Sequence, residues 1–311
     1  MRAVFMGTPA FAVPCIETLS GMPQVELVGV FTQPDRPKGR GYHTAQSPVK
    51  EKAVQLGLPV YQPDTAKDFD FVKQIDDWNP DVVVVVAYGL FLPNDALHLP
   101  KYGCVNVHAS LLPFYRGAAP IQRCLIDGCK ETGITTIRMD EGMDTGPILL
   151  RSKLSIRSDE TSITLHERLA ELGASTLQKT IVGMLEGSLE PLPQDHRQAT
   201  YAPRLTRESG RIDWNENASK IDSLIRGTQP WPTAHTTLNN KMLKIWKARV
   251  IPENSEERPG TITAITNQGI VVSTGGGSLL VEEIQAEGKK RMAVQSFIKG
   301  NTVIMNTILG D

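Results

Sequence analysis

The sequence predicts an α/β protein whose first half forms a doubly wound, mainly parallel sheet and whose second half forms a smaller β-barrel. Strand-like and helix-like runs alternate through the first half, and one of them, DVVVVVAYG (81–89), is continuously apolar and β-branched. After about residue 206, short strands separated by glycine and asparagine turns take over. The alternation is typical of a Rossmann-like sheet, and a wholly apolar strand is typical of a sheet covered on both faces.

Hydrophobic periodicity and turn residues predict the elements of the first half. The expected strands are residues 2–7, 25–32, 59–63, 81–89, 104–110, 133–139 and 147–156. The expected helices are residues 10–21, 49–59, 70–80 and 119–128, followed by a long amphipathic helix from Ser162 to Glu186. This last helix has leucine and isoleucine on one face and a Thr/Ser cap, and we expect it to close the first domain.

A proline-, glycine- and polar-rich stretch then predicts a linker. We expect a first domain at 1–188, a linker at 189–206 and a C-terminal domain at 207–311. In the C-terminal domain a short helix over NASKIDSLIRG precedes strands joined by Asn-Asn, Asn-Gln-Gly and Gly-Gly-Gly turns. This pattern predicts a small OB-like β-barrel or open sheet.

Charge is balanced overall but not locally. The net charge of −1 over 311 residues lacks the simple signature of a nucleic-acid-binding protein. However, Thr200 to Arg249 contains nine Lys/Arg against four Asp/Glu, whereas Ile251 to Glu287 contains six acids and one base. The second domain can therefore present a basic face that the total conceals.

Cysteine usage and hydropathy point to the cytoplasm. The four cysteines, Cys15, Cys104, Cys124 and Cys129, form no CxxC pair and have no histidines at zinc-like spacing. We therefore expect reduced thiols and neither a disulfide framework nor a metal site. No segment resembles a signal peptide or approaches the ~20 apolar residues of a membrane span.

The first strand is followed by GTPAFA, where a dinucleotide-binding fold carries GxGxxG. Only Gly7 matches that pattern, because Pro9 and Ala12 replace the glycines that let a backbone approach a pyrophosphate. We expect a tight turn between strand and helix here, with no nucleotide cradle.

Asn106 and His108 are the first candidate site residues. They alternate with Val105 and Val107, so both polar side chains face the same side of a strand. At the carboxyl end of such a strand that side opens on the ligand crevice of a doubly wound sheet. A lone histidine here would be read as a buried, hydrogen-bonded core residue. The pair, followed by a proline- and glycine-marked turn, favours a functional site.

A third polar group is expected in MDEGMDTG, which offers Asp140, Glu141 and Asp144. Ordinary turn formation explains Asp-Thr-Gly equally well, so spacing alone makes Asp144 only a candidate. An asparagine amide and a charged imidazole suit the oxyanion that develops on a carbonyl, and a nearby carboxylate can take up a proton. Ser110 is not in a GxSxG elbow. These features favour acyl transfer without a covalent enzyme intermediate.

Two segments carry a specific resemblance. NVHASLLPFYRGAAPIQ and TGITTIRMDEGMDTG resemble the signature of the folate-dependent formyltransferases: Asn-x-His, then Ser-Leu-Leu-Pro, then a later Asp-x-Gly. The resemblance implies that 10-formyltetrahydrofolate is the formyl donor, that no metal is needed, and that Asn106, His108 and Asp144 are catalytic. It also implies that tetrahydrofolate is bound by Ser110, Leu111, Leu112 and Pro113.

Further segments indicate which molecule accepts the formyl group. FTQPDRPKGRG, VVVVVAYGLFLP, RIDWN and PWPTAHT resemble, over nearly the whole chain, those family members that formylate methionyl initiator tRNA. Near the end, Met305-Asn306 stands where relatives often carry glycine, which bears on the geometry of the last strand. A formyltransferase acting on an amino-sugar nucleotide, a formyl-folate hydrolase and an inactive tRNA- or folate-binding protein are the alternatives; retention of all three polar residues argues against the last.

Two basic regions are expected to contact the tRNA. The loop at 34–48 carries Arg36, Lys38 and Arg40, and its prolines and glycines predict that neither helix nor strand continues through it. In the second domain KMLKIWKARV offers Lys244 and Lys247, although lysines that protect a solvated strand edge would look the same. We expect a monomeric cytoplasmic enzyme.

Overall fold

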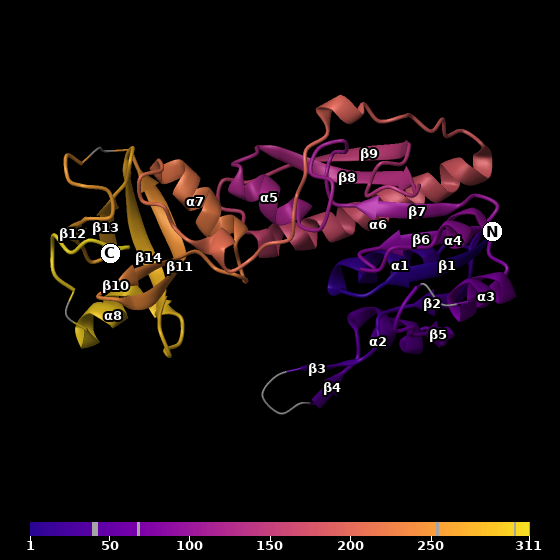
Figure 1. The fold of residues 1–311 in the computed structure, drawn as a ribbon, viewed down its shortest axis with the longest axis horizontal. Coiled ribbons are helices and arrows are strands. Elements are labelled where there is room, and N and C mark those ends of the chain that lie inside the picture. The colour runs from indigo at the N-terminus through magenta and orange to yellow at the C-terminus, as the bar shows by residue number, and fades with distance from the viewer. Residues whose placement is uncertain (39–42, 67–68, 253–254, 302, 311) are drawn as a thin grey trace. The chain divides into compact units, whose positions relative to one another are not determined.

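The computed structural model describes residues 1–38, 43–66, 69–252, 255–301 and 303–310 (Figure 1). The chain divides into two compact units. The first comprises residues 1–117, 131–155 and 166–201, and the second comprises residues 118–130, 156–165 and 202–311. Residues 189–201 of the expected linker thus group with the first unit, whereas residues 118–130 and 156–165 of the expected first domain group with the second.

The first unit is built on a seven-stranded sheet with the order β5-β2-β1-β6-β7-β8-β9. Its strands are β1 (Arg2–Gly7), β2 (Glu26–Phe31), β5 (Val60–Tyr61), β6 (Val82–Val86), β7 (Cys104–His108), β8 (Glu131–Arg138) and β9 (Ile148–Ser155). Strands β5, β2, β1, β6 and β7 are parallel, whereas β8 and β9 are antiparallel to their neighbours. The prediction of a mainly parallel sheet is confirmed.

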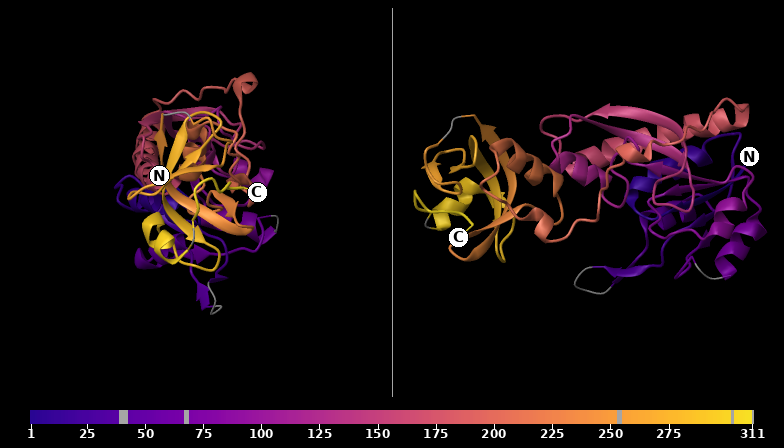
Figure 2. Two further views of the ribbon diagram at one scale, coloured as in Figure 1. Left: turned by 90° about the vertical axis from the view of Figure 1, so that its left-hand side faces the viewer. Right: turned by 45° about the horizontal axis from the view of Figure 1, so that its top comes forward.

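Helices cover both faces of this sheet (Figure 2). They are α1 (Val13–Ser20), α2 (Pro48–Gln55), α3 (Phe69–Trp78), α4 (Asn94–His98) and α6 (Ser162–Glu186). Val83 and Val85 of β6 belong to a cluster with Phe71 and Ile75 of α3. Every residue of β6 is at most 6% exposed, as expected for a central strand covered on both faces. The short helix α4 was not predicted.

Gly7 ends β1 and opens the tight turn that the sequence predicts. A 3-10 turn, η1 (Ala10–Ala12), leads from it into α1. A Cβ atom at Gly7 would lie 2.8 Å from the Phe5 ring and 2.9 Å from the Ala12 side chain. Close packing of the turn therefore explains this glycine without a bound phosphate.

The segment after β2 corrects one prediction. Strand β3 (Arg36–Lys38) pairs with β4 (His43–Ala45) in an antiparallel hairpin, so the prediction that no strand continues through residues 34–48 is wrong. Pro37 is tolerated because the hairpin has only two strands, and a proline needs no partner for its missing N–H on an edge strand. The hairpin projects from the sheet of the first unit (Figures 1 and 2). Arg40 lies outside the described residues.

The second unit contains a six-stranded antiparallel sheet, ordered β10-β11-β14-β13-β12 with β15 against β14. Its strands are β10 (His235–Leu238), β11 (Lys241–Ile251), β12 (Ile262–Ile265), β13 (Ile270–Ser273), β14 (Ser278–Ala286) and β15 (Met292–Ala293). Its helical elements are α5 (Pro120–Ile126), η3 (Glu208–Gly210), α7 (Ala218–Gly227) and α8 (Val294–Gly300). In the described residues β10 and β12 do not pair, so the predicted barrel is a curled, partly open one.

The turns of this unit follow the sequence. Asn239 and Asn240 have φ values of 51° and 61°, the left-handed conformation that asparagine tolerates in a two-residue hairpin turn. Near the C-terminus no regular strand forms among the described residues, and Ile308 makes a single bridge to Thr261. Asn306 has a φ of 65°, a conformation that glycine adopts readily and other residues rarely.

No helix among the described residues has the length and apolar character that spanning a membrane requires.

Candidate active site

Strand β7 places two polar side chains on one side of the sheet. Asn106 Nδ2 donates a hydrogen bond to Asp144 Oδ1 (3.2 Å), and His108 Nδ1 lies 3.5 Å from the same oxygen. Val105 and Val107, which alternate with them, are buried in the core. The structure thus brings together the three residues that the sequence singles out, from a strand and from a loop 36 residues further along.

The environment of His108 defines which of its nitrogens carry hydrogen. Its ring is 6% exposed, and Nε2 lies 2.9 Å from the carbonyl oxygen of Tyr115. Since a carbonyl only accepts hydrogen bonds, Nε2 carries a hydrogen, while Nδ1 faces the carboxylate of Asp144. A ring with hydrogen on both nitrogens satisfies both acceptors.

Asp144 is held on both of its carboxylate oxygens. Oδ1 accepts from Asn106, and Oδ2 accepts from the backbone N–H of Gly117 (2.8 Å). The backbone of Asp144 has a φ of 56°, which is unusual for a residue other than glycine. Unusual backbone conformations concentrate at functional sites, where the surrounding contacts maintain them.

The Ser-Leu-Leu-Pro segment forms a compact turn directly after β7. The Leu112 amide donates to Thr135 Oγ1 (3.1 Å), and that hydroxyl donates to the Ser110 carbonyl (2.7 Å). Ser110 Oγ in turn donates to the carbonyl of Phe114 (2.6 Å). Ser110, Leu112 and Pro113 are buried, so only Leu111 of the four keeps a partly exposed side chain. A ligand at this turn would meet Leu111 and the backbone.

Two buried polar residues beside Asp144 were not predicted from the sequence. Arg116 is 2% exposed and Gln194 is 6% exposed. Gln194 Oε1 accepts hydrogen bonds from the Arg116 guanidinium, and Gln194 Nε2 donates to the carbonyl oxygens of Asp144 and Gly146. Arg116 lies within the segment NVHASLLPFYRGAAPIQ, but the sequence predicted no role for it. Gln194 lies in the expected linker. Only its three-dimensional contacts distinguish Gln194 from its polar neighbours.

A basic groove lies in the second unit, with a volume of about 740 Å³. Its basic lining residues are Lys130, Arg157, Arg226, Lys247, Arg249 and Arg291. Two acids, Asp159 and Asp222, also line it, so bases dominate. Of the two lysines that the sequence proposes, Lys247 lines this groove and Lys244 does not. Lys130, Arg157, Arg226 and Arg291 were not predicted, because they come from four separate parts of the chain.

Ion pairs fix part of the groove. Lys247 Nζ lies 3.0 Å and Arg249 Nε lies 2.6 Å from the carboxylate of Glu282. Burial tends to raise the pKa of Glu282, but hydrogen bonds from these two bases outweigh it, so the pKa is lowered. The Arg291 guanidinium stacks over the Trp246 ring at 4.9 Å from its centroid.

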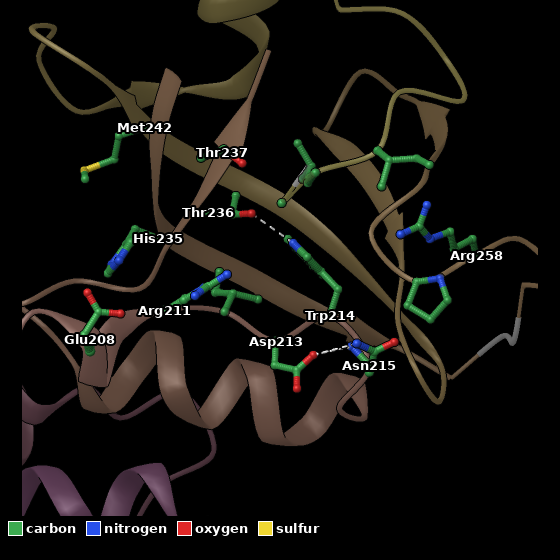
Figure 3. A pocket seen from close by; sticks show the side chains of 15 residues that line it. Glu208, Arg211, Asp213, Trp214, Asn215, His235, Thr236, Thr237, Met242 and Arg258 are labelled. Carbon is green, nitrogen blue, oxygen red and sulfur yellow. Dashed lines mark hydrogen bonds between the residues drawn. The ribbon is translucent and has the colours of Figure 1, made fainter. Parts of the chain in front are cut away.

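A second cavity of about 740 Å³ in the same unit has a mixed lining (Figure 3). Trp214 Nε1 donates to Thr236 Oγ1 across it (3.1 Å). Two bases, Arg211 and Arg258, are balanced by two acids, Glu208 and Asp213. None of the site residues expected from the sequence lines this cavity. No cluster of His, Cys, Asp and Glu suited to a metal ion occurs in the described part of the chain.

Comparison with known proteins defines the class. Residues 1–181 match the family model for the formyl transferase domain, and residues 204–302 match the model for the formyl transferase C-terminal domain. The chain therefore belongs to the formyl transferase family. Its relatives include the methionyl-tRNA formyltransferase of Alkaliphilus oremlandii, 49% identical over 312 residues and 100% of both chains, and that of Clostridioides difficile, 46% identical over 310 residues and 100% of both.

Solved structures show the same fold. An N-formyltransferase from Helicobacter canadensis, in complex with folinic acid and dTDP-3-aminofucose, matches with a TM-score of 0.67 at 17% identity, covering 92% of this chain and 99% of that one. A methionyl-tRNA formyltransferase from Clostridium thermocellum matches with a TM-score of 0.56 at 17% identity, covering 92% and 98%.

Proposed function

We propose that this chain transfers a formyl group from 10-formyltetrahydrofolate to the α-amine of methionyl initiator tRNA, as a monomer in the cytoplasm. The observation that supports the chemistry is that the side chains of Asn106 and His108 both converge on Oδ1 of Asp144, at 3.2 Å and 3.5 Å. Family membership supports formyl transfer. The full-length relatives, whose names specify methionyl-tRNA, support the acceptor.

The reaction forms one C–N bond and breaks another. The methionyl amine attacks the formyl carbon, and the formyl oxygen becomes an oxyanion. The intermediate then collapses by breaking the bond to N10 of the folate, which receives the proton that the amine loses. Transfer without a covalent enzyme intermediate needs donors for the oxyanion and a group that moves this proton.

The three residues fit these needs. Asn106 Nδ2 has a second hydrogen beyond the one it gives to Asp144. His108 Nδ1 is the nitrogen that turns to the oxyanion, because its 3.5 Å contact with Asp144 is long, whereas Nε2 stays on Tyr115 at 2.9 Å. Asp144 orients the imidazole and assists proton transfer to N10. The turn from Ser110 to Pro113 contacts the folate through its backbone and Leu111.

We place the tRNA against two basic regions. Strand β2 runs parallel to β7 within the sheet, so their carboxyl ends lie at the same end of the sheet. The hairpin that follows β2 therefore leaves the sheet at the end where His108 lies. On this hairpin Arg36 is exposed and donates to Gln33 (3.2 Å), and Lys38 ends β3. Arg40 belongs to the same proposed contact. In the second unit, we propose Lys247, which lines the basic groove, and, with a smaller contribution, Lys244 as phosphate contacts.

The test is acceptor discrimination by the intact chain. With 10-formyltetrahydrofolate as donor, we expect formylation of methionyl initiator tRNA with a kcat/KM at least about 100-fold above that for a dTDP-linked amino sugar. Release of formate without any acceptor is the third readout. Preferential formylation of the amino sugar, or formate release as the main product, would contradict the proposed acceptor.

A further inference from the structure

We infer that Gln194 and Arg116 are positioning residues for formyl transfer, and that they act by holding the carboxylate of Asp144 in place. The inference rests on the proposed role of Asp144. It adds to the site a segment, residues 192–201, that the sequence pattern places in a linker.

The Gln194 side chain is buried and all of its hydrogen-bonding groups are used. Its Nε2 donates to the carbonyl oxygens of Asp144 (2.8 Å) and Gly146 (2.7 Å). Its Oε1 accepts from Arg116 Nη2 (2.6 Å) and Nε (3.2 Å). Only one orientation of the amide satisfies two acceptors at one end and two donors at the other. Gln194 therefore holds residues 139–147, the loop between β8 and β9 that carries Asp144 (the Asp144 loop), in a single arrangement.

The Asp144 loop depends on such outside contacts. Asp144 has a φ of 56°, a conformation that a residue with a Cβ rarely adopts unaided. At Gly146 a Cβ atom would lie 1.9 Å from the Arg138 carbonyl oxygen, so the loop packs closely against the end of β8 and only glycine fits there. With the backbone carbonyls on both sides of Thr145 bound by Gln194, the carboxylate is directed at Asn106 and His108.

Arg116 connects Gln194, and through it the Asp144 loop, to the rest of the site. The residue before it, Tyr115, offers its carbonyl to His108, and the residue after it, Gly117, donates its N–H to Asp144 Oδ2. One turn thus binds the imidazole, the carboxylate and, through the Arg116 guanidinium, the amide of Gln194. A shift of Arg116 would move all three contacts together.

The segment that carries Gln194 is fastened at both ends. Leu192 exchanges two backbone hydrogen bonds of 2.8 Å with Ile148 of β9. Thr200 accepts from the Arg116 amide through its carbonyl and from the Tyr115 amide through its hydroxyl, both at 2.9 Å. Residues 192–201 therefore lie across the site as a strap that holds the amide of Gln194 against the Asp144 loop.

A double-mutant cycle tests whether Gln194 acts through Asp144. In single-turnover formylation of methionyl-tRNA, we expect Gln194→Ala to lower kcat by about 10- to 100-fold, since small displacements of catalytic groups cost this much. KM for both substrates should stay within about twofold. In an Asp144→Asn background the same change should cost less than about twofold, because the group being positioned is already lost.

Two further variants guard the interpretation. Gln194→Glu keeps the acceptors for Arg116 but loses both donors to the loop, so it should lower kcat as Gln194→Ala does, and a melting curve for each variant checks that the chain is still folded at the assay temperature. Gln198→Ala is the matched control, because Gln198 is exposed on the same segment and bonds only Asp195 among the described residues. It should leave kcat unchanged.

The outcomes separate the two proposals. If Gln194→Ala and Gln194→Glu both retain kcat within about twofold, or if Gln194→Ala costs as much without the Asp144 carboxylate as with it, the positioning role is overturned while the proposed function stands. If Asp144→Asn itself is fully active, the proposed mechanism fails and the inference falls with it.

Discussion

The buried hydroxyl group of Tyr88 lowers the stability of the folded protein. It lies two residues after the end of β6 and is 1% exposed in the cluster formed with α3 and α4. Among the described residues its hydroxyl has no hydrogen-bond partner, and burial raises its pKa. A buried hydroxyl without a partner loses its hydration and gains nothing in return.

Replacing Tyr88 by Phe should therefore stabilise the free protein. We expect the free energy of unfolding to rise by about 1 kcal/mol, because the change removes an unsatisfied polar atom and keeps the ring. Urea unfolding measured against the wild-type chain gives this number. A loss of stability of similar size would mean that the hydroxyl has a partner in solution.

At the scale of single residues, the sequence predicts the site in part. Period-two alternation with valine is sufficient to place Asn106 and His108 on one face, and the structure confirms it. Asp144 remains a candidate from spacing alone, since Asp-Thr-Gly is also an ordinary turn. Gln194 is beyond such reasoning, because its partners lie 48, 50 and 78 residues away and no local pattern records them.

At the scale of elements, β11 separates two lysines that look alike in the sequence. Lys247 lines the basic groove and pairs with Glu282, whereas Lys244 lies outside the groove and pairs in register with His235 and Gln285. Irregular register between Ile245 and Ala248 breaks the simple alternation along the strand. The sequence could not predict which lysine faces the groove, because no sequence pattern identifies a β-bulge within a run of mixed apolar and basic residues.

This difference predicts different salt dependence for the two variants. If Lys247 contacts a phosphate, Lys247→Ala should reduce the slope of log affinity for initiator tRNA against log salt by about 0.7–0.9. Lys244→Ala is the comparison on the same strand, and we expect a smaller change. An unchanged slope for both would mean that neither lysine contacts a phosphate.

At the scale of the whole molecule, the fold class follows from pattern but the limits of its parts do not. Alternating strands and helices predict the parallel sheet, and asparagine and glycine turns predict the antiparallel one. Residues 189–201 have the composition of a linker, yet Leu192, Gln194 and Thr200 bond to the first unit. The proline- and polar-rich composition of this segment predicts an exposed, flexible linker. A few hydrogen bonds from backbone and amide groups are enough to hold it to the first unit, and composition does not reveal them.

The length of an isolated first domain should therefore matter. A fragment of residues 1–201 should melt at a higher temperature than one of residues 1–188 and bind tetrahydrofolate more tightly, since only the longer one keeps the strap. Thermal melting with and without folate compares them. Equal melting temperatures and equal folate affinities would make the strap dispensable to the first unit.

The most direct test of the central claim removes the three polar groups one at a time. In single-turnover formylation of methionyl-tRNA, Asn106→Ala, His108→Ala and Asp144→Ala should each lower the rate by about 10²- to 10³-fold, as expected for loss of one stabilising group at an oxyanion. Glu141→Gln, an exposed carboxylate of the same loop, is the control and should retain full activity. A rate within about threefold of wild type for any of the three would remove that residue from the mechanism and contradict the account.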